Sequence, residues 1–218
     1  ETKSKENQKV IDKKEYYLIS EPKEIDDWIS EAEEAGEVAV DTETSSLDPH
    51  QANLVGISLC SKIGKACYIP IGHKSAKCIN KDAVIKKIKP LLEDPSIKKI
   101  GQNIKFDFIV LFKQGITISS MEDTMLMSYV LDAGKNRHNM DTLSEIHLGH
   151  KTISFKDMVG TGKKEINFSE VELDKAKDYA AEDADVTFRL YKKFIKNLKS
   201  EKMINIYEIF EKPLIKIL

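Results

Sequence analysis

Residues 38–44 read Val-Ala-Val-Asp-Thr-Glu-Thr, an apolar strand pattern that runs directly into two acids. Side chains two apart on a strand point to the same face, so Ala39, Asp41 and Glu43 share one face. Two neighbouring acids at the end of an apolar strand repel each other and resist desolvation. A cation between them would remove both penalties. The alternative is a strand that ends at a solvated edge with ordinary acids.

A second acid, Asp107, lies in a predicted helix over residues 103–113. Its apolar residues, at helical spacing, are Ile104, Phe108, Leu111 and Phe112. Asp107 falls on or beside this stripe, where an unpaired carboxylate costs roughly several kcal/mol. The alternative is an acid at the margin of the stripe that pairs with a nearby lysine such as Lys105.

The third acid-bearing segment is YAAEDAD at residues 179–185. Tyr179 and Asp183 are four apart on a predicted helix and therefore lie on one face. That face continues through apolar residues, whereas Glu182 and Asp185 are expected to point elsewhere into solvent.

Three separate segments that each direct an acid at the core are hard to explain without a shared cation. Ligand sets made only of oxygen suit hard ions such as Mg²⁺ or Mn²⁺. Four carboxylates carry a charge of about −4, which two divalent ions would balance. The sequence GTGKK at residues 160–164 lacks the upstream glycine and the following Ser or Thr of a phosphate loop, so that type of site is excluded.

Composition limits the class of protein. The chain has 218 residues, 41% of them hydrophobic, and a formal net charge of −2, which fits one globular domain. A nucleic-acid binder is more often basic, although an acidic metal site itself lowers the net charge. There is no apolar run of about 20 residues and no signal peptide, and the three cysteines match no zinc pattern. We therefore expect a cytoplasmic protein that does not enter a membrane.

The order of predicted elements indicates an α/β domain with a mixed sheet. Strands are predicted at residues 16–19, 38–44, 54–59, 66–71 and 97–100. Helices are predicted at residues 22–35, 81–93, 103–113, 121–132 and 140–148. Residues 1–14 form a polar linker and residues 149–168 a loop. Two further helices are predicted between residues 163 and 212, separated near Ser200, with Ser169 and Glu172 as a capping box at the start of the first.

Three stretches of the chain resemble the motifs of a known family. VAVDTETSSLDPHQANLVGISL, IGQNIKFDF and YAAEDADVTFRLY are similar to the three motifs of the ribonuclease H-like 3′→5′ exonucleases, in their tyrosine-type branch. The resemblance is closer still to the proofreading domain of bacterial DNA polymerase I. It extends through RHNMDTLSEIHLGHKTISF and covers residues 15–218.

This resemblance implies a ribonuclease H-like α/β fold, with a central five-stranded mixed sheet flanked by helices and one antiparallel strand. It implies that Asp41, Glu43 and Asp183 hold one divalent ion. Asp41 and Asp107 would hold a second, the latter through water. The ions would be Mg²⁺ or Mn²⁺, with Zn²⁺ as an alternative at one site. Tyr179 would orient the attacking water.

The resemblance also implies how a nucleic acid is held. Leu47 and Phe155 match residues that wedge against terminal bases. Thr44 matches another residue of the substrate site. Three more match residues near the terminal phosphate and sugar: Gln102, Asn103 and Arg137. Phe106 stands where close relatives often carry Tyr, so a role of that hydroxyl is not expected here.

The implied activity is hydrolysis of the 3′-terminal phosphodiester of single-stranded or frayed DNA, with release of nucleoside 5′-monophosphates. The implied domains are the exonuclease at residues 15–200 and a helix at 201–218 that leads to a polymerase domain of the same parent chain. We expect a monomer near the nucleoid. The alternatives are a ribonuclease D-like RNA exonuclease and an inactive structural or DNA-binding module.

Overall fold

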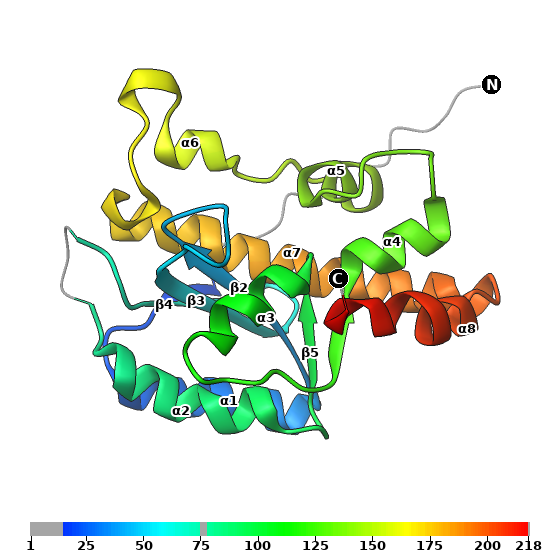
Figure 1. Cartoon of the computed structure of the whole chain (residues 1–218), viewed down its shortest axis with the longest axis horizontal. Helices are drawn as coiled ribbons and strands as arrows, with labels where there is room; N and C mark the ends of the chain where they lie inside the picture. Colours follow the sequence, from blue (N-terminus) through cyan, green and yellow to red (C-terminus); the bar gives the residue numbers. More distant parts are fainter. Residues whose placement is uncertain (1–14, 75–77, 218) are drawn as a thin grey trace.

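A six-stranded sheet forms the centre of the protein, which the computed structural model describes over residues 15–74 and 78–217. The linker expected at residues 1–14 lies outside the described residues. The strands, in the spatial order β1-β4-β3-β2-β5-β6, are listed here along the chain: β1 (Glu15–Leu18), β2 (Glu37–Thr44), β3 (Leu54–Lys62), β4 (Lys65–Pro70), β5 (Lys98–Gly101) and β6 (Met121–Asp123). Figure 1 shows this sheet enclosed by helices.

The sheet contains both parallel and antiparallel strand pairs. Strand β3 is antiparallel to both of its neighbours, β2 and β4, whereas the other pairs are parallel. The expected α/β class and the single antiparallel strand are therefore confirmed. The count of five strands is wrong, because β6 pairs with β5 as a sixth. The sequence predicts residues 121–123 as part of the following helix, because three residues are too few to show the alternation of a strand.

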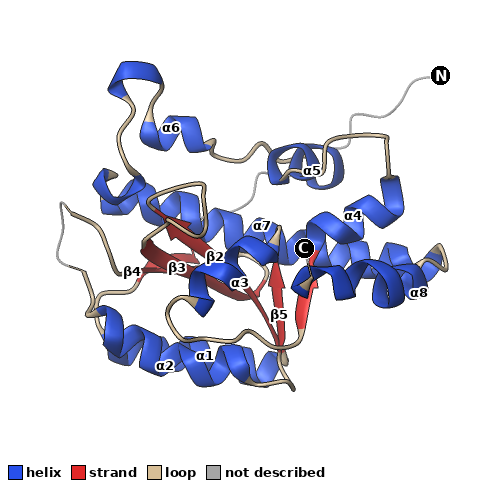
Figure 2. Cartoon of the chain, in the orientation of Figure 1, coloured by secondary structure: helices blue, strands red, loops and turns tan. Residues whose placement is uncertain are grey.

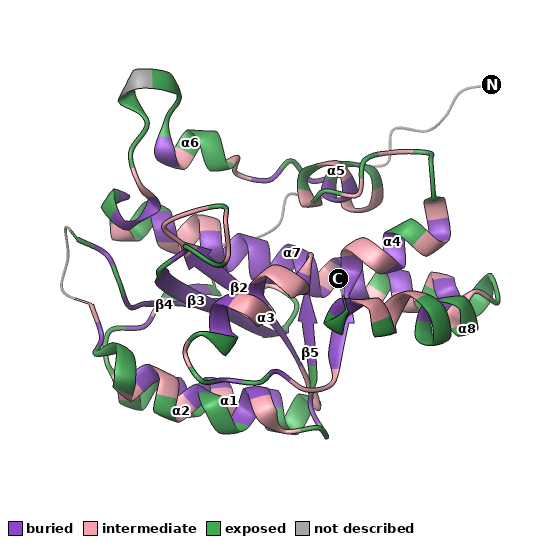
Figure 3. Cartoon of the chain, viewed as in Figure 1, coloured by how far each residue is buried: buried purple, intermediate pink, exposed green. Residues whose placement is uncertain are grey.

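Helices cover both faces of the sheet (Figure 2). One apolar core joins the sheet to three helices: α1 (Ile25–Ala35), α2 (Lys81–Glu93) and α3 (Ile104–Phe112). The core on the other face joins it to α4 (Thr124–Asp132), α5 (Met140–Leu148) and the long α7 (Leu173–Ser200). Figure 3 shows that the central strands and the middle of α7 are buried. This central position of α7 explains why acids on more than one of its faces are buried.

The connection between α5 and α7 is more regular than expected. Residues 149–168 contain α6 (Phe155–Val159) and η2 (Gly162–Lys164), and η3 (Phe168–Glu170) follows. The predicted capping box of Ser169 and Glu172 is wrong. The box forms between Asn167 and Glu170 at η3, whereas Glu172 precedes α7 without a side-chain cap. Both pairs place a residue that commonly caps helices three positions before a glutamate, so the sequence pattern does not distinguish them.

The remaining elements are short. A 3₁₀ turn, η1 (Pro22–Glu24), precedes α1, and α1 ends at Gly36 in the left-handed conformation (φ 66°), as its glycine predicted. Helix α7 ends at Ser200, as expected. Three short turns follow: α8 (Ile204–Ile206), η4 (Tyr207–Glu211) and η5 (Lys212–Lys216). Among the described residues, no helix combines the length and the apolar character needed to span a membrane.

Candidate active site

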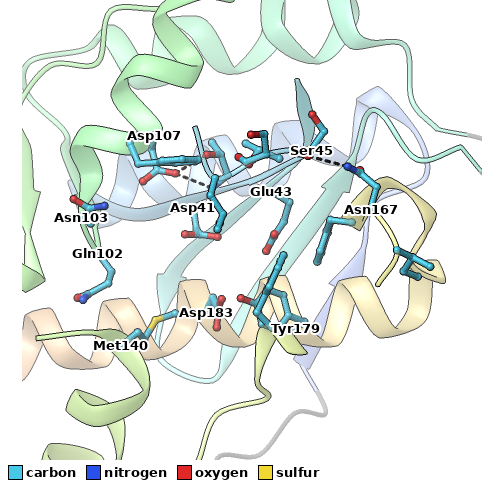
Figure 4. Close-up of a pocket in the computed structure, with 18 of the residues that line it drawn as sticks. Asp41, Glu43, Ser45, Gln102, Asn103, Asp107, Met140, Asn167, Tyr179 and Asp183 are labelled. Atoms are coloured by element: carbon cyan, nitrogen blue, oxygen red, sulfur yellow. Dashed lines mark hydrogen bonds between the residues drawn. The ribbon is translucent and has the colours of Figure 1, made fainter. Parts of the chain in front are cut away.

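Three carboxylates from two distant elements meet beside the end of β2 (Figure 4). Asp41 and Glu43 project from β2, and Asp183 projects from α7. One carboxylate oxygen of each lies within 4.8 Å of the others. Asp41 and Glu43 reach the same place because they are two residues apart on one strand.

Asp107 approaches the same strand from α3. It is 3% exposed, and its Oδ1 accepts hydrogen bonds from the Thr42 amide (2.9 Å) and the Thr42 hydroxyl (2.6 Å). The alternative in which Lys105 neutralises this acid is therefore wrong. Among the described residues, no lysine or arginine forms an ion pair with any of the four acids.

The cluster is electrostatically strained without a cation. Burial raises the pKa of Glu43 well above its ordinary value, and the charges of Asp41, Asp183 and Asp107 raise it further. Burial likewise raises the pKa of Asp107 and of Asp183, and in each case the charge of Asp41 adds to the effect. Burial raises the pKa of Asp41 to about 6. Desolvation thus opposes the ionised form of every member, and repulsion by neighbouring acids adds to it at Glu43, Asp107 and Asp183.

The donor set fits a divalent metal ion. Glu43 Oε1 is buried and has no hydrogen-bond partner, an arrangement that is costly unless a ligand supplies the missing interaction. All the available ligand atoms are carboxylate oxygens, which suit Mg²⁺ and Mn²⁺. The acidic cluster can therefore hold a divalent cation, as the spacing of the acids predicted.

Tyr179 lies one helical turn before Asp183, and its side chain hydrogen-bonds to that carboxylate. Burial, followed by the charges of Asp183 and the β2 acids, raises the pKa of Tyr179 far above its ordinary value. Its ring packs against Phe168, with centroids 5.8 Å apart, and against Phe155, at 6.2 Å. These rings form an apolar wall beside the carboxylates.

A cavity of about 550 Å³ opens over the acids. Besides Tyr179 and the four acids, it is lined by five of the six residues that the resemblance assigns to substrate binding: Thr44, Leu47, Gln102, Asn103 and Phe155. Arg137 does not line it. This arginine is exposed on the connection between α4 and α5, where the cavity wall is formed by Met140 instead.

Asp123 holds the backbone at the start of α3, beside this wall. Its carboxylate accepts from the backbone N–H groups of Asn103 (3.0 Å) and Ile104 (3.1 Å) at the start of α3. It also accepts from Met125 (2.8 Å) at the start of α4. Asn103 itself is left-handed, with φ 60°. One buried acid therefore caps two helices and orients the helix that carries Asp107.

Several lining residues were not identified from the sequence: Ser45, Ser46, Met140, Glu165, Ile166, Asn167 and Phe168. Most belong to the segment that was expected to be an unstructured loop. The spacing of Asn167 and Glu170 could have indicated the cap at η3. No sequence signal links Asn167 to Ser45, which it contacts from 122 residues away.

The expectation that Glu182 and Asp185 are solvated is wrong, because both are fully buried. Glu182 accepts hydrogen bonds from His150 Nε2 (3.0 Å) and from the Ile153 amide (2.6 Å). Asp185 accepts from the Tyr16 hydroxyl (2.8 Å), the Gly64 amide (2.9 Å) and Arg189 Nε (2.9 Å). These acids join α7 to its surroundings and are satisfied by protein donors, unlike Glu43.

The comparisons with known proteins agree with this geometry. A family model described as 3′-5′ exonuclease matches residues 16–199. DNA polymerase I of Rhizobium leguminosarum is 42% identical over 95% of this chain and 22% of its own length. DNA polymerase I of Pseudomonas aeruginosa is 40% identical over 94% of this chain and 23% of its own length. The chain therefore spans about a fifth of these curated relatives.

A solved structure of Brucella melitensis NrnC bound to pGG is also similar. It has a TM-score of 0.64 and 25% sequence identity, over 83% of this chain and 82% of NrnC. The family model includes all three segments that bring acids into the cavity. This chain therefore belongs to the 3′→5′ exonuclease domain family of DNA polymerase I.

Proposed function

We propose that this chain hydrolyses the 3′-terminal phosphodiester of single-stranded or frayed DNA and releases nucleoside 5′-monophosphates, using two divalent metal ions. The observation that carries the proposal is the group of three carboxylates within 4.8 Å of one another. One of their oxygens, Glu43 Oε1, is buried and unpartnered. A nuclease of this kind needs its acids held ready for cations that will neutralise them.

The four acids divide into two ligand sets. Asp41, Glu43 and Asp183 would hold one ion, and Asp41 with Asp107 would hold the other, Asp107 acting through water. Bound ions of this type lower the pKa of a water molecule and stabilise charge on a leaving oxygen. The Thr42 hydrogen bonds orient Asp107 for this role, as the partners of a metal ligand commonly do.

Tyr179 would position the attacking water. The raised pKa keeps its hydroxyl protonated, so it cannot act as a base near neutral pH. It can still donate to Asp183 and accept a hydrogen bond from water. Its ring is held by Phe168 and Phe155, which keeps the hydroxyl beside the carboxylates.

The substrate end would be gripped by apolar surface rather than by base-specific contacts. Leu47 is 84% exposed and Phe155 is 38% exposed, on different segments that line the cavity. Stacking of a base on an aromatic ring contributes about 1–3 kcal/mol and tolerates any sequence. Thr44, Gln102 and Asn103 would contact the sugar and phosphate. A mismatched end frays more easily than a paired one, so selectivity for errors would follow from duplex stability.

A polymerase domain in the same parent chain would deliver the strand. The domain boundaries follow the expectation from the sequence, with the exonuclease at residues 15–200 and residues 201–218 leading onward. The matched relatives are DNA polymerases I, and this supports DNA as the substrate.

The test is a nuclease assay on a 3′-labelled single-stranded oligonucleotide, with Mg²⁺ or with chelator. We expect release of labelled nucleoside monophosphate only with the metal, and none from Asp41→Ala. The matched control is Asp82→Ala, at an exposed position in the first turn of α2, which should cleave like the wild type. Cleavage by Asp41→Ala with Mg²⁺ would refute the proposal, as would activity in chelator.

The same assay addresses the ribonuclease D-like alternative. DNA and RNA oligonucleotides of matched sequence are compared, and we expect faster degradation of DNA. Faster degradation of RNA would assign the site to an RNA exonuclease, because such a site has to admit the 2′-hydroxyl. If neither oligonucleotide is cleaved, the remaining alternative is the inactive structural or DNA-binding module.

A further inference from the structure

A hydrogen bond joins the two rims of the cavity. Asn167 Nδ2 donates to the carbonyl oxygen of Ser45 over 2.8 Å, and both residues line the cavity (Figure 4). Ser45 follows β2, which supplies two of the acids. Asn167 precedes η3, on the segment that leads to α7. The bond therefore connects two segments that lie 122 residues apart in the sequence.

The Asn167 amide has only one orientation that satisfies its neighbours. Its Oδ1 accepts from the Ser169 amide (3.0 Å), and its backbone N–H donates to Glu170 Oε2 (3.0 Å). A flipped amide would place two donors against each other at Ser169 and two acceptors against each other at Ser45. The capping box at η3 thus aims Nδ2 at Ser45.

The loop that receives this bond is braced by several hydrogen bonds. Ser45 and Asn53 close its base through two hydrogen bonds of 3.0 Å each. Lys113 Nζ, at the end of α3, donates to three carbonyl oxygens of the loop, at 2.7–3.1 Å: those of Pro49, His50 and Ala52. Leu47 is 84% exposed on this braced loop. A contact at Ser45 therefore sets the position of Leu47.

The opposite rim carries Phe155. Its ring stacks on that of Phe168, with centroids 6.2 Å apart and planes 7° apart. Phe168 is 2% exposed and directly follows Asn167. The position of Asn167 thus governs the ring against which Phe155 rests.

We propose that Asn167 is a positioning residue that holds Leu47 and Phe155 at their places on the two rims of the cavity, and so sets the grip of the site on an unpaired 3′ end. Asn167 acts through these two side chains, without touching the scissile phosphate. This proposal rests on the proposed function, because it concerns how the same site grips its DNA.

Asn167→Asp tests the proposal without removing the cap. The Asp carboxylate can still accept from the Ser169 amide, but it has no donor for Ser45 and places an oxygen against the carbonyl. The matched control is Asn80→Asp. Asn80 caps α2 by accepting from the Ala83 amide (3.0 Å) and does not line the cavity, so this variant makes the same chemical change away from the site.

We expect Asn167→Asp to raise KM for a single-stranded 3′ end roughly threefold to tenfold, the effect of one lost hydrogen bond, and this increase should persist in about 0.5 M salt, where repulsion between the added charge and the DNA is screened. Its kcat should stay within about twofold of the wild type, because the carboxylates and Tyr179 are unchanged. Asn80→Asp should change neither constant. An unchanged KM for Asn167→Asp, or an equal loss of kcat in both variants, would overturn the proposal.

Binding in EDTA separates this proposal from the proposed function. Fluorescence anisotropy of a 5′-labelled oligothymidylate should show the same threefold to tenfold weakening for Asn167→Asp, about the effect of one hydrogen bond. If the wild-type chain binds the oligonucleotide but does not cleave it with Mg²⁺, the proposed function is refuted, and the ratio of the two Kd values still tests the role of Asn167. If wild type and Asn167→Asp bind with the same Kd, the role of Asn167 is refuted and the proposed nuclease activity is unaffected.

Discussion

Replacing Glu43 with glutamine should make the metal-free protein more stable while removing its response to metal. Glu43 is 6% exposed, one of its oxygens is buried without a partner, and three further acids raise its pKa. A buried group without a hydrogen-bond partner costs about 1–3 kcal/mol, and more when it is charged. Glu43→Gln is nearly isosteric and removes the charge, so the core packing is preserved.

The glutamine amide stays polar at this position, so the gain comes from removing the charge, and it is on the order of 1–3 kcal/mol in the free energy of unfolding in EDTA, since each unit by which the pKa is raised corresponds to about 1.4 kcal/mol. For a chain of 218 residues, 1 kcal/mol shifts the Tm by about 2–4 °C, so Glu43→Gln should unfold roughly 2–12 °C higher. With Mn²⁺ the Tm of the wild type should rise much more than the Tm of the variant. A cation at 100 times its Kd stabilises the folded state by about 2.7 kcal/mol. The variant should lose most of this stabilisation, because it lacks the Glu43 carboxylate.

The assay is thermal unfolding by circular dichroism in mildly alkaline buffer, with EDTA and with Mn²⁺. Glu33→Gln provides the control, because Glu33 is exposed on α1 and its replacement should shift neither curve. A lower Tm for Glu43→Gln than for wild type in EDTA would refute the reasoning. An equal gain from Mn²⁺ in both proteins would refute it as well.

Three further predictions concern neighbouring groups. In EDTA, the Tm should fall as pH rises from 3.8 to about 6, because burial raises the pKa of Asp41 to about 6 in the folded state. Over this range the native state binds more protons than the unfolded state, so a rise in pH destabilises it. Asp41→Asn should flatten this slope in thermal scans. Tyr179→Phe should lower kcat roughly tenfold or more through lost orientation of the water, yet leave the Tm increase with Mn²⁺ nearly unchanged; a large loss of that increase would make Tyr179 a metal ligand. Asp123→Ala should lower the free energy of unfolding by about 2–4 kcal/mol in urea titrations, since it uncaps α3 and α4 together, and an unchanged midpoint would contradict that capping role.

Periodicity accounts for most of what the sequence predicted correctly. The two-residue repeat of a strand placed Asp41 and Glu43 on one face, and the helical repeat placed Tyr179 beside Asp183. Local patterns of this kind depend on neighbours within one turn, so they survive without knowledge of the tertiary structure. They also located α2 at residues 81–93 and the end of α7 at Ser200.

The errors arise where tertiary contacts decide the outcome. Glu182 and Asp185 have ordinary positions on α7, and only the surrounding segments show that His150, Tyr16 and other donors bury them. Strand β6 exists because β5 offers an edge for three residues. Neither the bond between Asn167 and Ser45 nor the absence of Arg137 from the cavity wall has a local signature.

The bracing by Lys113 has a consequence for motion. Helix α3 carries Asp107 near its start and is followed by Lys113, whose ammonium group donates hydrogen bonds to the loop that bears Leu47. Helix α3 and this loop therefore cannot move apart without breaking several hydrogen bonds. Under the proposed function, movement that admits and releases a nucleotide would then occur in the opposite rim, the segment between α5 and α7 that carries Phe155. Exchange of amide hydrogens with solvent should accordingly be faster in that segment than in the loop held by Lys113.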